Sequence, residues 1–253
     1  MKNIDYDRDY KKIADNLVDW LRNKVDAAGA KGAVVGLSGG IDSSVTVRLA
    51  QKAFGENVLG VIMPCHSKSR DAEDAEMLAE MFSVKHIKYD LSDVFDHFLD
   101  GLNSTGIEGS RLAEANIKPR LRMTALYYYA QSLNYLVVGT DNRSELKIGY
   151  FTKYGDGGID LGPLGSLVKN EVKGLARELG IPEEIINKKP SAGLWQGQTD
   201  EEEMGFSYQE LDHYILTGEA EKEIKNKINR LAEKNKHKLQ PIPIPDRDEI
   251  LGQ

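Results

Sequence analysis

The sequence predicts an α/β fold in three layers, with a parallel sheet flanked by helices. Short apolar runs rich in Val, Ile and Leu alternate with longer segments whose apolar residues recur at helical spacing. Such alternation is typical of βαβ units, whose right-handed crossovers place helices on both faces of a parallel sheet. The chain of 253 residues contains no internal repeat and no low-complexity linker. We therefore expect one domain over residues 1–253.

Four short apolar runs are predicted to be strands. Each is too short for a buried helix and contains several β-branched residues. A fifth strand is expected near Ile159–Leu161. The four runs are Ala33–Leu37, Val58–Met63, Val84–Tyr89 and Tyr135–Gly139.

Helical periodicity precedes, separates and follows these runs. The first helix, over Ile13–Val25, carries apolar residues on one face. An amphipathic helix begins near Ser166 and is closed by Gly180, and the region 91–134 has room for two or more helices. The segment 188–205 shows no periodicity and is expected to be a mobile loop. Further helices are expected over Ser43–Phe54, Asp71–Phe82, Tyr208–Leu216 and Ala220–Glu233.

Composition and charge argue against several classes of protein. Acidic residues outnumber Lys and Arg by 40 to 33, for a net charge of −7, whereas nucleic-acid binding relies on a broad basic surface. No apolar run approaches the ~20 residues that a membrane span requires, and the polar N-terminus lacks the apolar core of a secretory signal. Cys65 is the sole cysteine, which excludes an internal disulfide and a thiolate zinc cluster. We therefore expect a cytoplasmic protein without nucleic-acid or membrane partners.

The stretch AVVGLSGGIDSSV, residues 33–45, joins the first predicted strand to the next helix through a glycine turn. Backbone N–H groups at a helix N-terminus carry partial positive charge and bind anions. Gly39 and Gly40 allow close approach of a ligand, and Ser38, Ser43 and Ser44 can add hydroxyl donors. The turn therefore predicts an anion cradle of phosphate size. It matches neither the G-x-x-x-x-G-K-[ST] P-loop nor the dinucleotide pattern G-x-G-x-x-G.

Asp42 lies in this cradle, where a carboxylate would repel bound phosphate unless a cation separated the two. Mg²⁺ commonly bridges one or two carboxylates to phosphate oxygens. The simpler alternative is that Asp42 only interacts favourably with the dipole of the following helix. The stretch SGGIDSS resembles the pyrophosphate loop of the N-type ATP pyrophosphatases. That superfamily cleaves ATP between the α and β phosphates and adenylates a substrate.

Six later motifs narrow the resemblance. They are KPRLRM (118–123), GTDNRSE (139–145), GYFTKYGDGGID (149–160), LVKNEVKGLARELG (167–180), KKPSAGLW (188–195) and HK (237–238). In this order they resemble the ammonia-dependent NAD synthetases, from about residue 13 to 246. The resemblance implies a Rossmann-like fold of the adenine nucleotide α-hydrolase type. It also implies amidation of deamido-NAD⁺ through an acyl-adenylate, yielding NAD⁺, AMP and diphosphate in the last step of NAD biosynthesis.

Two alternatives share this fold. One is another N-type ATP pyrophosphatase, but those enzymes lack the TKYGDG and HK motifs. The other is a nucleotide-binding protein that is no longer catalytic, which should have lost Asp42, Glu145 or Lys169. This chain keeps all three residues.

The resemblance assigns one group of residues to ATP and magnesium. Thr140 and Glu145 follow the fourth predicted strand, at the sheet edge where ligands bind in open α/β folds. Glu145 is expected to hold Mg²⁺ together with Asp42, although by itself it suggests a cap or an ion pair within the next helix. Lys169 is expected to contact ATP phosphates and offset charge as the α–β bond breaks. The ATP set is Gly36, Leu37, Ser38, Gly39, Gly40, Ile41, Asp42, Ser43, Thr140, Lys169 and Ser191, where the family usually has Thr in place of Ser191.

A second group is assigned to deamido-NAD⁺ and ammonia. Arg120, the first arginine of R-x-R-M, is expected to contact the dinucleotide. From their sequence pattern alone, Arg111, Lys118, Arg120 and Arg122 suggest equally a pyrophosphate site and a solvated helix face. Asp156 is expected to attract ammonium or to take the proton from attacking ammonia. The dinucleotide set is Arg120, Lys153, Asp160, His237 and Lys238.

The resemblance also bears on assembly and on the source of ammonia. Family members are homodimers with the dinucleotide at the subunit boundary, and LYYYA at 126–130 is expected to be core or subunit interface. Because the synthetase motifs begin by residue 36, we expect no glutaminase domain, so ammonia would come from solution or from a separate protein. Pro64–Cys65 stands where the family usually has P-Y, so the resemblance does not specify the residues of the adenine pocket.

Overall fold

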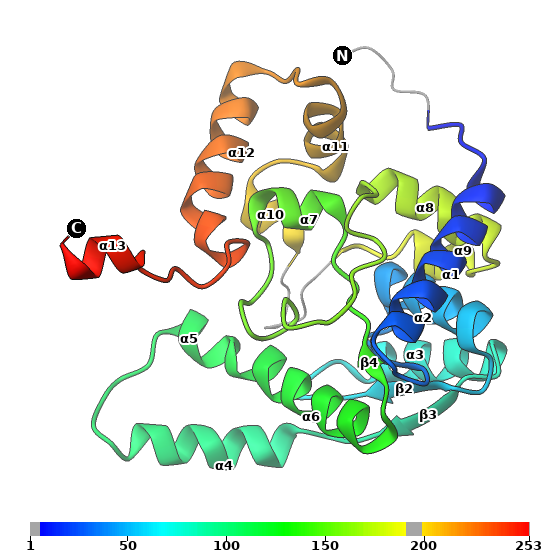
Figure 1. The fold of residues 1–253 in the computed structure, drawn as a ribbon, viewed down its shortest axis with the longest axis horizontal. Coiled ribbons are helices and arrows are strands. Elements are labelled where there is room, and N and C mark those ends of the chain that lie inside the picture. Colours follow the sequence, from blue (N-terminus) through cyan, green and yellow to red (C-terminus); the bar gives the residue numbers. More distant parts are fainter. Residues whose placement is uncertain (1–5, 191–198, 253) are drawn as a thin grey trace.

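A four-stranded parallel sheet, in the order β3–β2–β1–β4, organises the chain (Figure 1). The computed structural model describes residues 6–190 and 199–252. In the register of the sheet, Ala33 lies opposite Val58 on one side and Leu136 on the other. The strands are β1 (Ala33–Leu37), β2 (Val58–Ile62), β3 (Lys85–Lys88) and β4 (Leu136–Val137). The four predicted strands are therefore confirmed, with β4 shorter than expected.

The fifth predicted strand is reduced to one bridge in the described part of the chain. Val138 pairs with Leu161 in parallel, outside any named strand. Ile159 packs directly against Gly139, where a Cβ would lie 2.4 Å from the Ile159 side chain. Gly162 and Pro163 then follow, and proline cannot donate to a sheet ladder. This segment consequently ends as a loop that passes the edge of the sheet.

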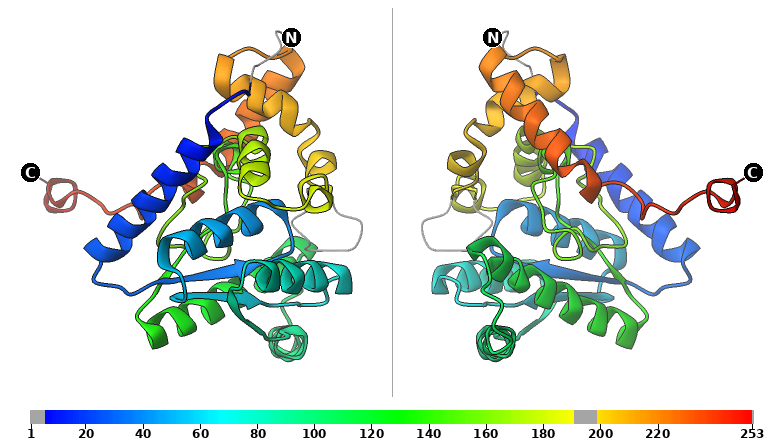
Figure 2. Two further views of the ribbon diagram at one scale, coloured as in Figure 1. Left: turned by 90° about the vertical axis from the view of Figure 1, so that its right-hand side faces the viewer. Right: turned by 90° about the vertical axis from the view of Figure 1, so that its left-hand side faces the viewer.

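Helices cover both faces of the sheet (Figure 2). One face carries α1 (Tyr10–Ala27), α2 (Ile41–Phe54), α3 (Ser69–Met81) and α8 (Lys169–Glu178), whose apolar residues share one core cluster with β1 and β2. The other face carries α4 (Ser92–Asn103) and α6 (Ile117–Leu133), packed on a second cluster. This three-layer arrangement confirms the expected fold class.

A third apolar cluster holds the C-terminal helices together, away from α4 (Figure 1). Its buried members include Ile148, Met204, Leu211 and Ile228. The helices around it are α7 (Arg143–Ile148), α10 (Asp200–Met204), α11 (Tyr208–Thr217) and α12 (Lys222–Asn235). The remaining short helices are α5 (Arg111–Ala115), α9 (Glu183–Ile186), the 3₁₀ turn η1 (Lys236–Lys238) and α13 (Arg247–Leu251).

Part of the segment expected to be a mobile loop is helical. Residues 191–198 lie outside the described residues, but Asp200–Met204 forms α10. Met204 is buried, and the Tyr150 hydroxyl donates to the Glu203 carboxylate at 2.7 Å. These contacts come from residues distant in sequence, so local periodicity does not report them.

The tyrosine-rich stretch on α6 is partly core. Ala130 is buried, and Tyr127 and Tyr129 pack against the second apolar cluster. Tyr128 is 66% exposed.

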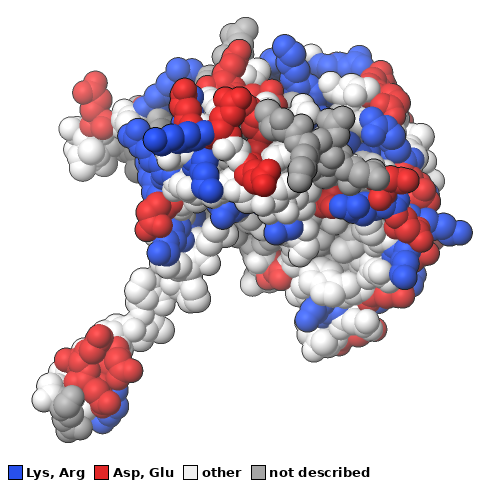
Figure 3. Space-filling view, turned by 90° about the horizontal axis from the view of Figure 1, so that it is seen from above, with Lys and Arg blue, Asp and Glu red and all other residues white. Residues whose placement is uncertain are grey.

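The C-terminal segment that ends in α13 extends away from the rest of the molecule (Figure 1). Acidic and basic side chains are interspersed over the face shown in Figure 3. Among the described helices, none is both long and apolar enough to cross a bilayer.

Candidate active site

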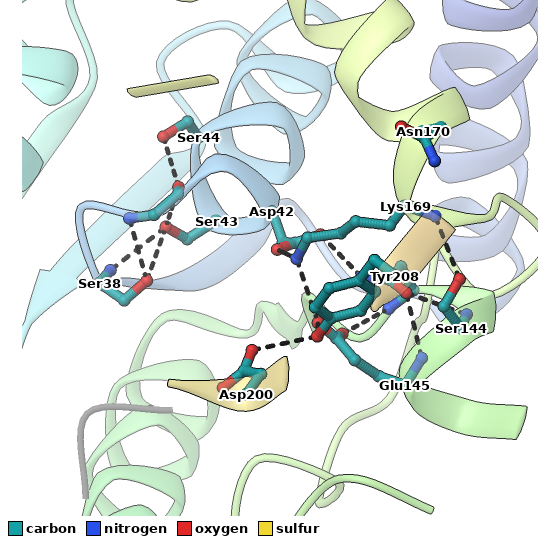
Figure 4. Close-up of polar contacts among 12 residues, drawn as sticks. Ser38, Asp42, Ser43, Ser44, Ser144, Glu145, Lys169, Asn170, Asp200 and Tyr208 are labelled. Carbon is teal, nitrogen blue, oxygen red and sulfur yellow. Dashed lines mark hydrogen bonds and ion pairs between the residues drawn. The ribbon is translucent and has the colours of Figure 1, made fainter. Parts of the chain in front are cut away.

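The turn between β1 and α2 is locked into one shape (Figure 4). Gly39 has a φ of +72°, and a Cβ there would lie 2.2 Å from the carbonyl oxygen of Asp71. Both conditions require glycine. Ser43 Oγ and Ser44 Oγ donate to the Gly40 carbonyl at 3.0 and 2.7 Å, while the Ser38 and Ser43 hydroxyls lie 3.0 Å apart. Hydrogen bonds from these serines therefore hold the turn in this conformation. Helix α2 begins directly after the turn, at Ile41.

Lys169 lies between two carboxylates at the start of α2 and α7 (Figure 4). Its Nζ is 2.6 Å from Asp42 Oδ2 and 3.2 Å from Glu145 Oε1. The Lys169 side chain is only 3% exposed. Asn142 Nδ2 donates to the other Asp42 oxygen at 3.0 Å. The turn, α7 and α8 thus meet at one cluster of charges with two negative groups and one positive group.

A capping box directs Glu145 toward Lys169. The Asn142 side chain accepts from the backbone N–H groups of Ser144 and Glu145, and Glu145 Oε2 accepts from Asn142 N at 3.0 Å. These reciprocal hydrogen bonds satisfy backbone N–H groups in the first turn of α7. The other carboxylate oxygen of Glu145, Oε1, faces Lys169. Burial raises the pKa of Glu145 to about 7, against the lowering effect of the Lys169 ammonium. Burial alone would lower the pKa of Lys169, but the carboxylates of Asp42 and Glu145 outweigh it and the pKa is raised.

Asp212 holds the N-termini of α7 and α8 in register. Its carboxylate, which is fully buried, accepts from Ser144 Oγ at 2.5 Å and from Asn170 N at 2.8 Å. Ser144 Oγ in turn accepts from Lys169 N at 3.1 Å. Asp212 on α11 therefore positions Glu145 and Lys169 together. No sequence motif assigned a role to Asp212, Asn142 or Ser144, and only the N-x-x-E pattern at 142–145 carried a local signal, as a capping box.

Two tyrosines connect this cluster to α10. The Tyr208 hydroxyl lies 3.0 Å from Asp200 Oδ2 and 3.3 Å from Glu145 Oε1, and the Lys169 ammonium lies 4.9 Å from the Tyr208 ring centroid. The Tyr150 hydroxyl also reaches Asp200, at 3.2 Å. The acidic run that begins at Asp200 is thus tied to the Lys169 cluster.

A cleft of about 1200 Å³ contains most of the residues singled out in the sequence. Its lining includes the glycine turn, the Lys169 cluster and a set of basic residues from α6, the loop 149–158 and η1 that we call its basic end. The predicted site residues that line it are Gly36, Leu37, Ser38, Gly40, Ile41, Asp42, Ser43, Arg120, Thr140, Glu145, Lys153, Asp156, Lys169, His237 and Lys238.

Three predicted residues do not line this cleft or cannot be placed. Gly39 shapes the turn behind it, against α3. Asp160 accepts from Val137 N at 2.8 Å and from the Tyr127 hydroxyl at 3.0 Å, at the end of β4. Ser191 lies outside the described residues.

The basic end of the cleft joins the loop 149–158 to the C-terminal region. Lys153 Nζ donates to the carbonyl of His237 at 2.9 Å. Lys238 Nζ donates to the carbonyls of Gly149 and Phe151, each at 2.8 Å. The two lysines thus bind the loop to η1 on one side of the cleft.

The basic residues of α6 are not one solvated face. Arg122 Nε donates to the Met63 carbonyl at 3.0 Å, and Lys118 is 8% exposed. Arg120 is exposed at the cleft, with Nη2 3.4 Å from the Lys153 carbonyl. The interpretation of the whole set as a solvated face is therefore wrong for Lys118 and Arg122. Both turn inward because α6 packs on the second apolar cluster.

The carboxylates beside the turn suit magnesium. Asp42 and Glu145 offer hard oxygen donors, and Mg²⁺ is commonly held by one or two carboxylates together with phosphates. Within residues 6–190 and 199–252, no group of three His, Cys, Asp or Glu side chains is arranged to hold a metal ion. A magnesium ion held by this pair would take its remaining ligands from water and phosphate oxygens, and the ion pairs with Lys169 show that both carboxylates face a cation.

Similar proteins of known sequence identify the family. The family model for NAD synthase matches residues 13–242. The chain belongs to the NAD synthase family. The family expected from the motifs is thus confirmed. An NH(3)-dependent NAD(+) synthetase from Carboxydothermus hydrogenoformans is 53% identical over 237 residues, covering 93% of this chain and 98% of the relative.

Solved structures show the family fold. The chain superimposes on NMN synthetase from Francisella tularensis with a TM-score of 0.91 and 39% identity, covering 95% of this chain and all of the other. It superimposes on NH3-dependent NAD synthetase from Campylobacter jejuni with a TM-score of 0.79 and 30% identity, at the same coverage. The adenine nucleotide α-hydrolase-like fold expected from the sequence is confirmed.

Proposed function

We propose that the chain catalyses the ammonia-dependent synthesis of NAD⁺, as a ligase that forms a carbon–nitrogen bond. ATP, deamido-NAD⁺ and ammonia are the substrates, and NAD⁺, AMP and diphosphate are the products. The observation that carries the proposal is Lys169 held between Asp42 and Glu145 at the glycine turn. A paired cation and two carboxylates beside an anion cradle suit cleavage of ATP between the α and β phosphates. The names of the curated relatives support the same reaction.

The first step activates the carboxylate of the nicotinate ring. A carboxylate is a poor electrophile, so its oxygen attacks the α-phosphorus of ATP and diphosphate leaves. Backbone N–H groups of the turn and of the start of α2 bind the departing diphosphate, and Lys169 exchanges its carboxylate partners for phosphate oxygens. Magnesium held by Asp42 and Glu145 would supply neutralising charge to the diphosphate. Thr140 and Ser191 complete the proposed ATP site.

The second step replaces AMP by ammonia. The nitrogen attacks the acyl carbon, the bond to AMP breaks, and the attacking nitrogen loses a proton. Asp156, which is exposed in the cleft and accepts from Thr152 N at 2.9 Å, is the proposed proton acceptor. Splitting one difficult substitution into two easier ones is the advantage of covalent activation.

The basic end of the cleft is the proposed site for deamido-NAD⁺. Arg120, Lys153 and Lys238 supply positive charge for its pyrophosphate, and the His237 ring can add a hydrogen-bond donor. Asp160 lies outside the cleft lining, next to Tyr127 on α6, so its proposed contact with the dinucleotide requires a second copy or a rearrangement. We propose a cytoplasmic homodimer with the dinucleotide at the boundary between subunits, with the exposed Tyr128 in that interface.

Nicotinate mononucleotide is a second candidate substrate. The TM-score is 0.91 with NMN synthetase from Francisella tularensis and 0.79 with the NAD synthetase from Campylobacter jejuni. The same carboxylate would be adenylated and amidated in either case. The two substrates differ only in the adenylyl half, which the basic end of the cleft would bind.

One assay separates these candidates. Purified protein is supplied with ATP, Mg²⁺ and either deamido-NAD⁺ or nicotinate mononucleotide, and with ammonium or glutamine. We expect NAD⁺ formation from deamido-NAD⁺ with ammonium. A higher kcat/KM with the mononucleotide would favour the second candidate, and equal turnover with glutamine would contradict ammonia dependence.

A further inference from the structure

Lys188 belongs to the motif at 188–195, but the steps above give it no role. It follows the short helix α9, whose Ile185 and Ile186 are buried in the core cluster around β1 and β2. Its backbone is therefore anchored to the core. Its side chain reaches the glycine turn, 149 positions earlier in the chain, where Nζ donates to the Gly39 carbonyl at 3.2 Å. A cation thus lies behind the turn that is proposed to bind phosphate.

Three acceptors surround the Lys188 ammonium. Nζ lies 2.8 Å from Asp71 Oδ1 and 2.8 Å from Asp74 Oδ2, both on α3. Asp74 is buried, and Arg70 Nε lies 2.9 Å from its other oxygen. Together with the Gly39 carbonyl, the two carboxylates provide one acceptor for each N–H donor of a lysine ammonium. Burial lowers the pKa of Lys188, but the hydrogen bonds with Asp71 and Asp74 outweigh it and the pKa is raised. The charged ammonium is therefore committed to the turn and to α3.

The Gly39 carbonyl and the Gly40 N–H belong to one peptide group. Because this group is planar and trans, the two point in opposite directions. Gly39 is buried against α3, where its carbonyl meets Lys188, whereas Gly40 lines the cleft. The Gly40 N–H makes a long hydrogen bond to Ser38 Oγ, at 3.3 Å. Holding the carbonyl behind the turn thus directs the N–H toward the side on which a phosphate would bind.

Steric effects alone do not select this orientation of the peptide. Both residues that flank it are glycines, which have no Cβ to oppose rotation of the peptide group. In the opposite orientation the carbonyl oxygen would face the cleft, and its partial negative charge would repel phosphate oxygens. Anion-binding turns instead present successive N–H groups. The turn therefore needs a group that favours one of the two orientations.

We propose that Lys188 is a positioning residue that holds the peptide between Gly39 and Gly40 with its N–H toward the diphosphate site. This inference rests on the proposed function, because diphosphate is released only if ATP is cleaved between the α and β phosphates. An N–H donor that is already oriented needs no reorganisation as charge develops on the leaving diphosphate. Lys169 acts on the phosphates directly, whereas Lys188 acts through the backbone.

The first test is the exchange of diphosphate into ATP by Lys188→Met, with deamido-NAD⁺ present and ammonium absent. Loss of an N–H donor to a charged group weakens binding by about 10- to 100-fold, so the KM for diphosphate should rise by that factor. The KM for deamido-NAD⁺, which is bound at the basic end of the cleft, should stay within about two-fold of wild type. An unchanged KM for diphosphate would overturn the proposal.

Crystal structures of the wild type and of Lys188→Met distinguish this role from direct contact with phosphate. Without the ammonium, the Gly39 carbonyl would face the carboxylates of Asp71 and Asp74 without their shared donor, which is costly in a buried setting. We expect the peptide of the variant to turn its carbonyl toward the cleft. A peptide in the wild-type orientation together with a raised KM for diphosphate would assign Lys188 to the phosphate itself and overturn the proposal.

A matched control removes another lysine that pairs with α3. Lys88 lies 2.9 Å from Glu76 on α3, and Lys88→Met should keep the wild-type KM for diphosphate. Wild-type protein that shows no exchange of diphosphate would contradict the proposed function. Exchange by the wild type with unaltered kinetics in Lys188→Met would contradict only the positioning role.

A second variant covers the case in which Lys188→Met does not fold, as judged by thermal unfolding. The double variant Lys188→Met, Asp71→Ala also removes one of the carboxylates that the ammonium balances. It still leaves the Gly39 carbonyl without its donor, so the KM for diphosphate should again rise. A wild-type KM for diphosphate in the double variant would overturn the proposal.

Discussion

Lys169 Nζ lies 2.6 Å from Asp42 Oδ2, across 127 positions of sequence. Each residue is unusual in its local setting, because Lys169 places a cation at a helix N-terminus and Asp42 places a carboxylate beside an anion cradle. Together they neutralise each other in a buried site. When a triphosphate enters, the same two groups can separate, with the cation turning to phosphate and the carboxylate to magnesium.

Replacing Lys169 should lower kcat more than it weakens the binding of ATP. Lys169→Met removes the only positive charge hydrogen-bonded to Asp42 and Glu145 in the described structure, and with it the charge that offsets the breaking α–β bond. Loss of one such group typically lowers kcat by about 10²- to 10³-fold. Steady-state kinetics with ATP varied would measure it. Lys173→Met on the same helix is the matched control, and a kcat within about three-fold of wild type for Lys169→Met would contradict this role.

Gly39 should not tolerate a side chain. Gly39→Ala places a Cβ 2.2 Å from the Asp71 carbonyl oxygen at a φ of +72°, so the turn must shift. We expect the free energy of unfolding to fall by at least about 2 kcal/mol, with a higher KM for ATP. Gly101→Ala on α4 meets nothing within 4 Å and should gain about 0.5–1 kcal/mol. Urea unfolding of both variants measures the difference, and similar stabilities would count against the clash.

Asp212 should make stability fall as pH rises. Burial raises the pKa of Asp212 above 3.8, against the lowering effect of hydrogen bonds from Ser144 and Asn170. Between its ordinary and raised pKa, the folded state keeps a proton that the unfolded state has lost, so the free energy of unfolding decreases with pH in that window. The slope from one proton is at most about 1.4 kcal/mol per pH unit. Urea unfolding across this window should give a flatter profile for Asp212→Asn.

The exposed Asp15→Asn serves as the control for that profile, because it changes the same charge without burial. It should reproduce the slope of the wild type. If Asp212→Asn had that same slope, the buried carboxylate would not be the origin of the pH dependence.

Arg120 should act on the pyridine nucleotide and not on ATP. Its side chain is exposed in the cleft, and Nη2 lies 3.4 Å from the Lys153 carbonyl. Arg120→Ala should raise the KM for deamido-NAD⁺ about ten-fold or more while the KM for ATP stays unchanged. Arg230→Ala, an exposed arginine on α12, is the control. A change confined to the KM for ATP would contradict the assignment of Arg120 to the deamido-NAD⁺ site.

The inner strands β1 and β2 were predictable because they are buried on both faces. A short, uninterrupted apolar run such as Val58–Ile62 has few alternatives to a buried strand. The short helix α10 was not predictable, since Met204 packs into a cluster and Tyr150 and Tyr208 bind its acids only after α7 and α11 have come together. Periodicity reports one element at a time and cannot include such contacts.

The candidate site was also predictable only in part. A phosphate-sized cradle at Ser38–Ser43 follows from glycine and helix chemistry, and Asp42 pointed to a cation. The pairing of Asp42 with Lys169 and Glu145 needed the resemblance to a family, because local sequence also allowed a simple cap for Glu145. Asp212 lies 68 positions from Ser144, so no local pattern could reveal the hydrogen bond that fixes α7 against α8.

In the proposed reaction, the carboxylate of the substrate attacks the α-phosphorus of ATP. The most direct measurement starts from deamido-NAD⁺ carrying ¹⁸O in the nicotinate carboxylate, with ATP, Mg²⁺ and ammonium, and analyses the products by mass spectrometry. Attack at the α-phosphorus predicts that AMP acquires one ¹⁸O from the substrate carboxylate while diphosphate has none. Unlabelled AMP, with the ¹⁸O in diphosphate or orthophosphate, would contradict it.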